Sequence, residues 1–345
     1  MDGPLPALDG FAMPAEWMPH ARCWLAWPAR TELWRELHPL ACQAYAGVAR
    51  AIAAYEPVAM IVPPGIEAEA RLLLGKNVEV VPLPIDDSWT RDSGPTFVTD
   101  ADGAVAAVAW RFNAWGNRYH PYDRDAALAR TIADRLGMRC YDGPLVLEGG
   151  AVHVDGAGTV LATEESILND NRNPTLSREQ VEERLALHLG ARRMVWLESG
   201  LMYDETDGHI DNCARFVAPG VVMVAMPERE DDPSFARLVA NRDRLAQATD
   251  AAGRTLEIIE LPHPSPALGQ HGPLSRSYVN FYIANGAVIV PRFDDSADDA
   301  AATIIGRVFP DRVVVQIDAS IIVEGGGGLH CITQQQPEGP ITPVR

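Results

Sequence analysis

Four polar segments of the chain contain the residues whose types could do chemistry. In one-letter code they are residues 86–95 (DDSWTRDSGP), 147–150 (LEGG), 204–212 (DETDGHIDN) and 324–331 (EGGGGLHC). A cysteine is nucleophilic as its thiolate, and a histidine can move protons near neutral pH. We therefore take Cys331 as the candidate nucleophile of a hydrolase and His209 as its candidate acid and base.

Carboxylates in the same segments suggest what the nucleophile would act on. Glu148 could orient the imidazole and stabilise its protonated form. Asp92 and Asp211 then remain as extra carboxylates. A guanidinium group presents its N–H donors in a planar fork, which paired carboxylates match bidentately. The set therefore fits a guanidinium substrate, and the glycines at 325–328 would let the backbone turn tightly beside it.

The same residues have simpler interpretations, which residue types alone leave open. Cys331 could be a small buried hydrophobe, although the four glycines before it weaken that view. Asp92 could form only a structural ion pair with its neighbour Arg91. Trp89, like the other tryptophans, would by default be a core aromatic. Glu205 could be a surface charge.

A metal site is the main competing chemistry. His209 and Asp211 are two positions apart, so on a strand they would share one face. Together with His330 they could ligate a metal ion in a metal-dependent hydrolase. A third hypothesis is a non-catalytic protein that binds guanidines without releasing ammonia. The complete set of a cysteine, a histidine, a glutamate and two aspartates favours thiol catalysis, with no metal and no cofactor.

The elements that must position these residues repeat along the chain. Helical patterns occupy residues 32–55, 123–136, 178–189 and 234–252, the third beginning after Ser177 and the fourth ending at Gly253. Between them, turns rich in Gly, Asp or Asn join short apolar runs: 96–98 with 104–110, 151–154 with 159–163, 214–217 with 221–225, and 279–283 with 287–291. We also expect residues 313–317 to approach 329–333, and residues 23–27 and 58–62 to form another unit.

This alternation of strand pairs and helices predicts an α/β fold of repeated β-β-α-β units that pack around a shared centre. The alternative is a doubly wound nucleotide-binding sheet, which needs a glycine loop between a strand and a helix. The glycines at 325–328 instead come near the end of the sequence and lead towards an expected strand. We therefore favour the repeated units.

Composition limits the partners and the compartment. The 345 residues carry a formal net charge of −18, which disfavours nucleic acid and anionic membrane surfaces and favours small cations. The five cysteines are widely spaced and odd in number, which disfavours a disulfide framework. Neither a signal peptide nor a membrane-spanning apolar run is visible in the sequence. We expect a cytoplasmic protein, and its oligomeric state, including a homo-oligomer, stays open.

Taken together, the motifs resemble the agmatine deiminase family of the peptidylarginine-deiminase-like, guanidine-modifying superfamily. The matching segments span most of the chain: 13–17 (MPAEW), 24–28 (WLAWP), 86–95, 111–116 (RFNAWG), 147–154, 163–165 (TEE), 171–174 (NRNP), 205–212, 277–280 (SYVN) and 330–337 (HCITQQQP). The resemblance implies an α/β-propeller, or pentein: five ββαβ modules around a pseudo-fivefold axis, in one domain over residues 1–345.

The resemblance also implies roles for individual residues. Cys331 would be the nucleophile and His209 the acid and base. Glu148 would pair with the histidine, and Asp92 and Asp211 would hold the guanidinium. In the same way, Trp89 and Glu205 would line the amine end of the substrate.

The reaction implied is hydrolysis of agmatine to N-carbamoylputrescine and ammonia through a thiouronium on the cysteine. Free arginine and peptidyl arginine are the alternative substrates, and Arg91 would favour them if it faced the pocket, because an arginine fork binds carboxylates. Two segments depart from the family's usual letters. Gly328 stands where asparagine is usual, which removes an amide beside the site, and residues 151 and 152 are alanine and valine rather than serine and isoleucine.

Overall fold

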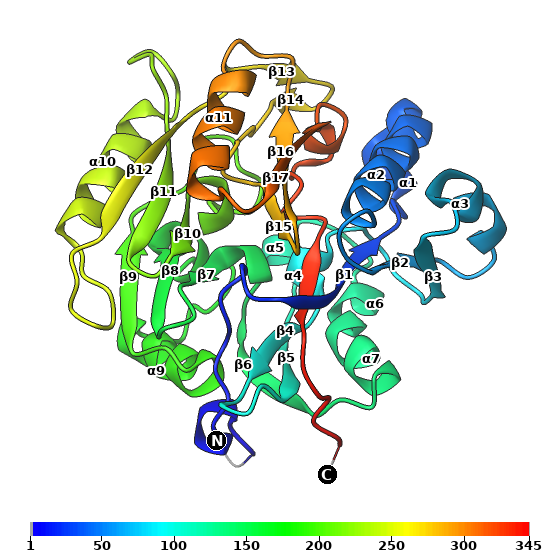
Figure 1. Ribbon diagram of the computed structural model, residues 1–345, viewed down its shortest axis with the longest axis horizontal. Coiled ribbons are helices and arrows are strands. Elements are labelled where there is room, and N and C mark those ends of the chain that lie inside the picture. The colour runs from blue at the N-terminus through cyan, green and yellow to red at the C-terminus, as the bar shows by residue number, and fades with distance from the viewer. Residues whose placement is uncertain (1–2, 345) are drawn as a thin grey trace.

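A computed structural model describes residues 3–344, and the strands in this part of the chain form five mixed sheets and one short hairpin (Figure 1). One sheet has the order β18 (Gln334–Pro337), β1 (His20–Ala26), β2 (Val58–Val62), β3 (Val78–Pro82). The hairpin joins β13 (Leu268–Gly269) and β14 (Gly272–Pro273).

The other four sheets have three strands each, in chain order. They are β4 (Thr96–Thr99), β5 (Val105–Arg111) and β6 (Cys140–Val146); β7 (Val152–Val154), β8 (Thr159–Thr163) and β9 (Arg193–Leu197); β10 (Ala214–Ala218), β11 (Val221–Met226) and β12 (Glu257–Pro262); and β15 (Tyr282–Ala284), β16 (Ala287–Arg292) and β17 (Val313–Asp318).

The same pairing recurs in all five sheets. In each three-stranded sheet the first two strands are antiparallel and the third is parallel to the second. In the remaining sheet, β18 is antiparallel to β1, and β2 and β3 follow in parallel. Antiparallel neighbours need only a tight turn, whereas parallel neighbours need a long crossover. The turns use glycines such as Gly103 and Gly220, both at φ 80°.

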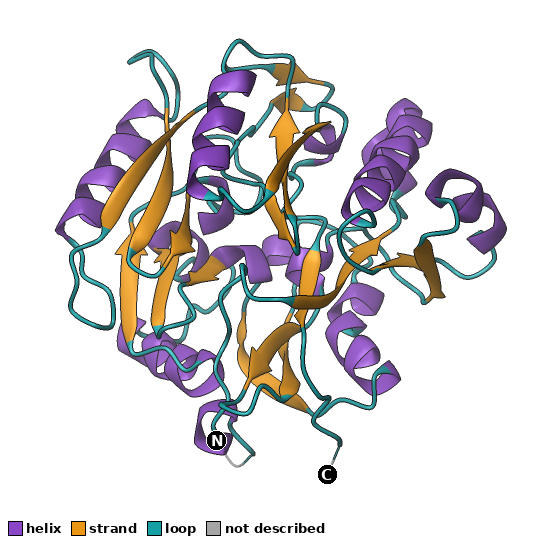
Figure 2. Cartoon of the chain, in the orientation of Figure 1, coloured by secondary structure: helices purple, strands orange, loops and turns teal. Residues whose placement is uncertain are grey.

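Helices provide the crossovers and lie on the outer side of the sheets (Figure 2). The longer ones are α2 (His38–Ile52), α3 (Glu67–Leu74), α7 (Leu128–Arg135), α9 (Arg178–Leu189), α10 (Phe235–Gln247) and α11 (Asp298–Val308). Short helical turns are α1 (Thr31–Trp34), α4 (Thr90–Ser93), α5 (Ala114–Asn117), α6 (Asp123–Ala126) and α8 (Glu164–Ile167), with 3-10 turns η1 (Pro6–Asp9), η2 (Arg35–Leu37), η3 (Gly149–Ala151), η4 (Ile210–Asn212) and η5 (Ile322–Gly325).

The predicted helices are found, but two of them are interrupted. The helix over 178–189 is confirmed as α9, and Ser177 and Gln180 form the capping box that begins it. The stretch 32–55 divides into α1, η2 and α2, because Arg35 has φ 48° and Pro39 must lie in the first turn of a helix. The stretch 123–136 divides into α6 and α7 at Ala127.

Two further expectations were wrong. Helix α10 ends at Gln247 and not at Gly253, because Ala248 is extended and Thr249 bridges to Thr255. Residues 329–333 are not a strand beside β17, which pairs only with β16 in its sheet. They form a turn in which the Thr333 hydroxyl donates to the Leu329 carbonyl at 3.0 Å, and the chain then enters β18.

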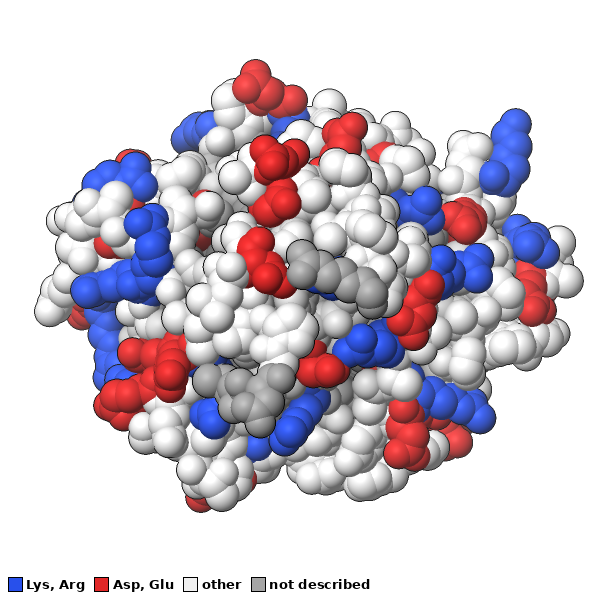
Figure 3. All heavy atoms as spheres, turned by 90° about the horizontal axis from the view of Figure 1, so that it is seen from below, with Lys and Arg blue, Asp and Glu red and all other residues white. Residues whose placement is uncertain are grey.

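The described residues contain no helix that is long and apolar enough to cross a membrane. Seen from below in Figure 3, acidic and basic side chains lie interspersed with uncharged ones on that face. The negative net charge is therefore not gathered there into a single block.

Candidate active site

The site is built from short turns rather than from the strands themselves. Asp92 lies in α4, and Glu148 immediately precedes η3. His209 caps the start of η4 and Asp211 lies within it, so the expectation that these two share one face of a strand was wrong. Turn α4 contacts η3, and η3 contacts η4. Cys331 follows η5 in the C-terminal turn, which completes the set.

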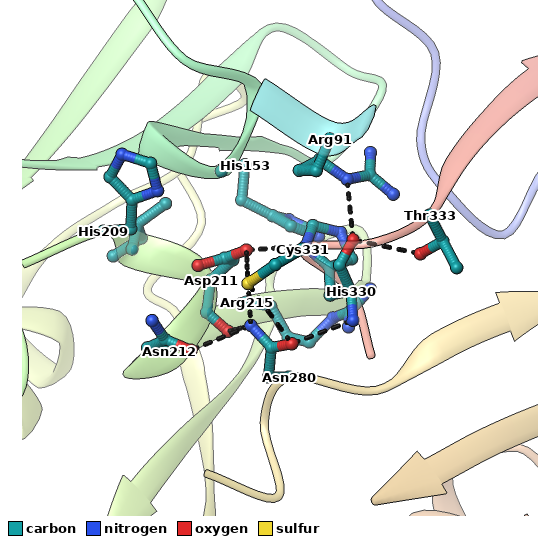
Figure 4. Close-up of polar contacts among 12 residues, drawn as sticks. Arg91, His153, His209, Asp211, Asn212, Arg215, Asn280, His330, Cys331 and Thr333 are labelled. Carbon is teal, nitrogen blue, oxygen red and sulfur yellow. Dashed lines mark hydrogen bonds and ion pairs between the residues drawn. The ribbon is translucent and has the colours of Figure 1, made fainter. Parts of the chain in front are cut away.

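Cys331 is buried beside one carboxylate and one amide (Figure 4). Its Sγ lies 3.2 Å from Nδ2 of Asn280 and 3.7 Å from Oδ2 of Asp211. Burial, together with the charges of Asp211 and Asp92, raises the pKa of the thiol well above its ordinary value. In the unliganded protein the nucleophile is therefore a protonated thiol, and it needs a nearby cation to ionise.

His209 is fully buried between two carboxylates. Its Nδ1 lies 3.8 Å from Oδ1 of Asp92, and its Nε2 lies 3.6 Å from Oε2 of Glu148. Burial lowers the pKa of the imidazole, but Asp92, Glu148 and Asp211 outweigh burial and raise it to about 9. His209 is thus an imidazolium at neutral pH, ready to donate a proton.

Glu148 is held in place by an arginine that residue types alone did not single out. Arg172 donates from Nε to Oε1 of Glu148 at 2.7 Å, and its Nη1 donates to Asp207 at 3.0 Å. Burial raises the pKa of Glu148, yet the charges of Arg172 and His209 lower it overall. Arg172 therefore keeps Glu148 ionised beside the imidazole. The arginine of the NRNP segment was the signal available in the sequence, and only the structure shows that its side chain is buried.

Asp92 is oriented by two neutral donors and has no arginine partner among residues 3–344. The Gly150 amide donates to its Oδ1 at 2.9 Å, and the indole N–H of Trp115 donates to its Oδ2 at 2.9 Å. The structural ion pair with Arg91 does not form. Burial raises the pKa of Asp92. Gly150 cannot be larger, because a Cβ there would lie 2.7 Å from Nδ1 of His209.

Asp211 is anchored from behind by His330. The Nδ1 of His330 lies 2.8 Å from Oδ2 of Asp211, and its Nε2 lies 2.8 Å from Oε1 of Glu16. Burial raises the pKa of Asp211, but the hydrogen bond and charge of His330 lower it overall. The other carboxylate oxygen, Oδ1, is buried and has no hydrogen-bond partner within residues 3–344.

The geometry of His330 also bears on a metal site. Both ring nitrogens face carboxylate oxygens, so neither is free to ligate an ion. Within the described part of the chain, no three His, Cys, Asp or Glu side chains are arranged to hold a metal. The residues proposed for a metal-dependent hydrolase therefore do not form the coordination set that zinc prefers.

Arg91 turns away from the nucleophile. Its Nη2 donates to Gln335 at 2.7 Å, its Nε donates to the His330 carbonyl at 3.3 Å, and its Nη1 lies 3.4 Å from Glu16. The side chain is buried in these contacts and is absent from the cavity above Cys331. It is therefore not placed to receive a substrate carboxylate.

A cavity leads from Cys331 to the surface. The Trp89 ring stacks on Trp34 with centroids 6.2 Å apart, and Glu205 accepts a hydrogen bond from the Tyr119 hydroxyl at 2.5 Å. Tyr119 and Glu205 also line a wider outer depression, which contains several arginines. The cavity itself is lined by Trp89, Asp92, Trp115, Tyr119, Glu205, Thr206, Gly325, Gly326, Gly327 and Cys331.

The glycines that line this cavity allow neighbouring side chains to pack against the backbone. A Cβ on Gly327 would lie 2.5 Å from the Trp89 ring, and Gly326 has φ 95°. The structure therefore brings Trp89 and Glu205 to the same cavity as Asp92 and Cys331. Glu148, His209 and Asp211 are buried and do not line the cavity; Asp211 contacts the thiol, and His209 lies between Asp92 and Glu148.

Comparison with known families agrees with this arrangement. The family model described as Porphyromonas-type peptidyl-arginine deiminase matches residues 12–337. The chain belongs to this family. It is 44% identical over 356 residues to the agmatine deiminase of Pseudomonas putida, covering 96% of this chain and 97% of that protein. It is also 44% identical over 358 residues to an agmatine deiminase of Pseudomonas aeruginosa, with the same coverage.

Solved structures give the same relationship. The agmatine deiminase of Enterococcus faecalis superposes with a TM-score of 0.94 at 36% identity, over 98% of this chain and 99% of that one. A Cys-to-Ser variant of a C. jejuni agmatine deiminase with substrate bound gives a TM-score of 0.88 at 27% identity, over 96% of this chain and 97% of that one. An amidinotransferase from Microseira wollei, at 13% identity and a TM-score of 0.55, is similar in fold only.

Proposed function

We propose that this protein hydrolyses agmatine to N-carbamoylputrescine and ammonia, with Cys331 as the covalent nucleophile. The observation that carries the proposal is a buried thiol beside two carboxylates, Asp92 and Asp211, at the inner end of a cavity that Glu205 lines further out. Such a site suits a small molecule with a guanidinium at one end and a second cation at the other.

The guanidinium docks between Asp92 and Asp211. Asp211 Oδ1 is buried and lacks a partner among the described residues, so it can accept a guanidinium N–H at little cost. In the described part of the chain, the cation nearest to Asp92 is His209 at 3.8 Å, and a guanidinium would supply a second positive charge. The same positive charge favours ionisation of the Cys331 thiol, which the two carboxylates oppose before substrate arrives. The thiol proton passes to solvent as the guanidinium docks and returns from solvent after the product leaves.

In the first half-reaction the Cys331 thiolate attacks the guanidinium carbon. The His209 imidazolium gives its proton to one terminal nitrogen, the C–N bond breaks, and ammonia leaves. A thiouronium remains on the cysteine, and the imidazole is now neutral. Glu148, fixed by Arg172, holds the ring in place during this step.

In the second half-reaction water attacks the same carbon. The neutral His209 takes one proton from the water as the C–O bond forms. Collapse breaks the C–S bond and releases the ureido product and the Cys331 thiolate, and the remaining oxygen-bound proton passes to solvent. His209 is then an imidazolium again, as at the start.

The amine end of the substrate lies towards Trp89 and Glu205. An ammonium is stabilised by a carboxylate and by the face of an indole ring, and both line this cavity. Free arginine would bring its carboxylate to the same region, where Glu205 would repel it. Arg91, which could have compensated, points towards Glu16 and Gln335.

The fold and setting are part of the same proposal. The repeated pairing in five sheets, and the completion of the β1 sheet by β18 from the chain's end, support one α/β-propeller domain of five ββαβ modules. All five cysteines are free thiols, which supports a reducing compartment such as the cytoplasm. Neither nucleic acid nor a membrane surface is a partner in this proposal.

A screen of ammonia release tests the proposal. Agmatine, free arginine and an arginyl peptide are compared as substrates of the wild-type protein, Cys331→Ala and His209→Asn. We expect the highest kcat/KM with agmatine and no turnover in Cys331→Ala. Preference for arginine or the peptide, or activity that dies with EDTA but survives iodoacetamide, would overturn it.

A further inference from the structure

The side chain of Asn280 connects three parts of the site. It is buried just before β15. Its Nδ2 donates to Oδ1 of Asn212 at 2.8 Å and lies 3.2 Å from Sγ of Cys331. Its Oδ1 accepts the backbone N–H of His330 at 2.8 Å. Figure 4 shows the sulfur between this amide and the Asp211 carboxylate.

The orientation of this amide is fixed by its partners. The His330 N–H can only donate, so it must face the oxygen of Asn280 and not the nitrogen. Asn212 donates through its own Nδ2 to Asp204 at 3.0 Å, which leaves its Oδ1 to accept one N–H of Asn280. The second N–H of Asn280 then has the sulfur of Cys331 at 3.2 Å from the nitrogen, nearer than the Asp211 carbonyl at 3.4 Å.

We propose that Asn280 is a catalytic residue that donates an N–H hydrogen bond to the Cys331 thiolate. The inference rests on the proposed function in taking that thiolate as the nucleophile. A neutral donor suits the position, because a permanent cation there would compete with the guanidinium for Asp92 and Asp211. The amide stabilises the thiolate as it forms and when it is released at the end of the second half-reaction.

The surroundings of the sulfur explain why such a donor matters. Burial and two carboxylates all oppose ionisation of the thiol. The groups that lower its pKa are the backbone of Gly328 and the side chain of Asn280. If the amide were removed, the backbone of Gly328 would remain as the other hydrogen-bond donor to the sulfur.

Gly328 packs directly against this amide. A Cβ at position 328 would lie 2.4 Å from Oδ1 and 2.8 Å from Cγ of Asn280. Even an alanine at 328 would push the amide away from its partners.

Alkylation of Cys331 by neutral iodoacetamide tests the proposal without turnover. The rate constant is measured at one near-neutral pH on the unliganded protein, by mass spectrometry of the peptide containing Cys331, because only the thiolate reacts. Asn280→Asp keeps the acceptor for His330 but replaces the donor by a carboxylate. We expect alkylation to slow about 10- to 1000-fold, because losing the donor raises the pKa of the thiol further. Gly328→Ala should slow it in the same direction.

The control is Asn241→Asp. Asn241 is an equally buried amide, but it donates to the Ser199 carbonyl and not to a group of the candidate site. It should leave the rate unchanged. Unchanged alkylation in Asn280→Asp would overturn the proposal. If that variant does not fold, unchanged alkylation in Gly328→Ala would do so. Slowed alkylation in a protein whose wild type releases no ammonia from agmatine would instead reject the proposed function and leave the role of the amide standing.

Discussion

His330 joins Asp211 to Glu16 through its two ring nitrogens, each 2.8 Å from a carboxylate oxygen. The ring therefore bridges two buried acidic side chains. Glu16 in turn lies beside Arg91 and Arg215. The carboxylate that faces the thiol is therefore the outer end of a buried polar network that runs through His330 to Glu16 and two arginines.

Neutralising Glu16 should destabilise the protein. Glu16→Gln leaves His330, Arg91 and Arg215 buried without their shared anion, so we expect a loss of about 3 to 5 kcal/mol in the free energy of unfolding. The pKa of Glu16 is held well below 4.5 by these cations, although burial opposes them. Its contribution is thus present above pH 4.5 and is lost as the pH falls through the lower folded value.

Urea unfolding of wild type and Glu16→Gln at several pH values measures this contribution. The difference between the two should be greatest above pH 4.5 and should shrink on acidification. A matched control is Asp231→Asn, an exposed acid paired with Arg229, which should leave the stability nearly unchanged. A Glu16→Gln protein as stable as wild type would contradict the account.

Asp211→Asn should weaken substrate binding. The change removes the charge that meets the guanidinium and replaces one acceptor oxygen by a donor. Losing one partner of a buried charge pair costs about 2 kcal/mol or more, which is at least about thirtyfold in Kd. Calorimetric titration of agmatine into Cys331→Ala, with and without Asp211→Asn, measures the effect. Equal affinities would mean that Asp211 does not hold the guanidinium.

The pH dependence should report the His209 imidazolium. Its pKa of about 9 predicts that kcat/KM falls as the pH rises through that value, since the proton donor is lost. Glu148→Gln removes one of the carboxylates that raise this pKa, so the alkaline limb should move to lower pH. An alkaline limb at the same pH in both proteins would assign it to another group.

Glu205 should set the preference for a substrate with an amine. Glu205→Gln is expected to lower kcat/KM for agmatine by about ten- to a hundredfold, the value of a hydrogen bond to a charged group. Butylguanidine, which has no amine, should be affected far less. The ratio of the two kcat/KM values is the measurement. Equal losses for the two substrates would remove Glu205 from the amine subsite.

The sequence was informative about the fold where the elements are local. The hairpin turns and the capping box at Ser177 depend on neighbouring residues, and the expected strand pairs and helix α9 follow from them. Pairing between distant segments was not accessible in this way. The partner of β18 is β1, more than three hundred residues earlier, and no local pattern distinguishes it from β17.

The candidate site divides in the same manner. Cys331, His209, Glu148, Asp92 and Asp211 could be proposed from residue types and the family resemblance. The residues that hold these five side chains in place could not be proposed from the sequence, because their burial and contacts depend on the tertiary structure. Arg172, Glu16, Trp115 and Asn280 all lie in motifs that were noticed, yet only their contacts reveal that they hold the carboxylates and the sulfur.

The most direct test is whether agmatine becomes attached to Cys331 during turnover. Wild-type protein is mixed with excess agmatine, quenched with acid at short times, and examined by intact-mass and peptide mass spectrometry. We predict an adduct on Cys331 with the mass of agmatine less ammonia, which is absent from Cys331→Ala. Steady ammonia release with no such adduct, or release that persists in Cys331→Ala, would contradict the mechanism.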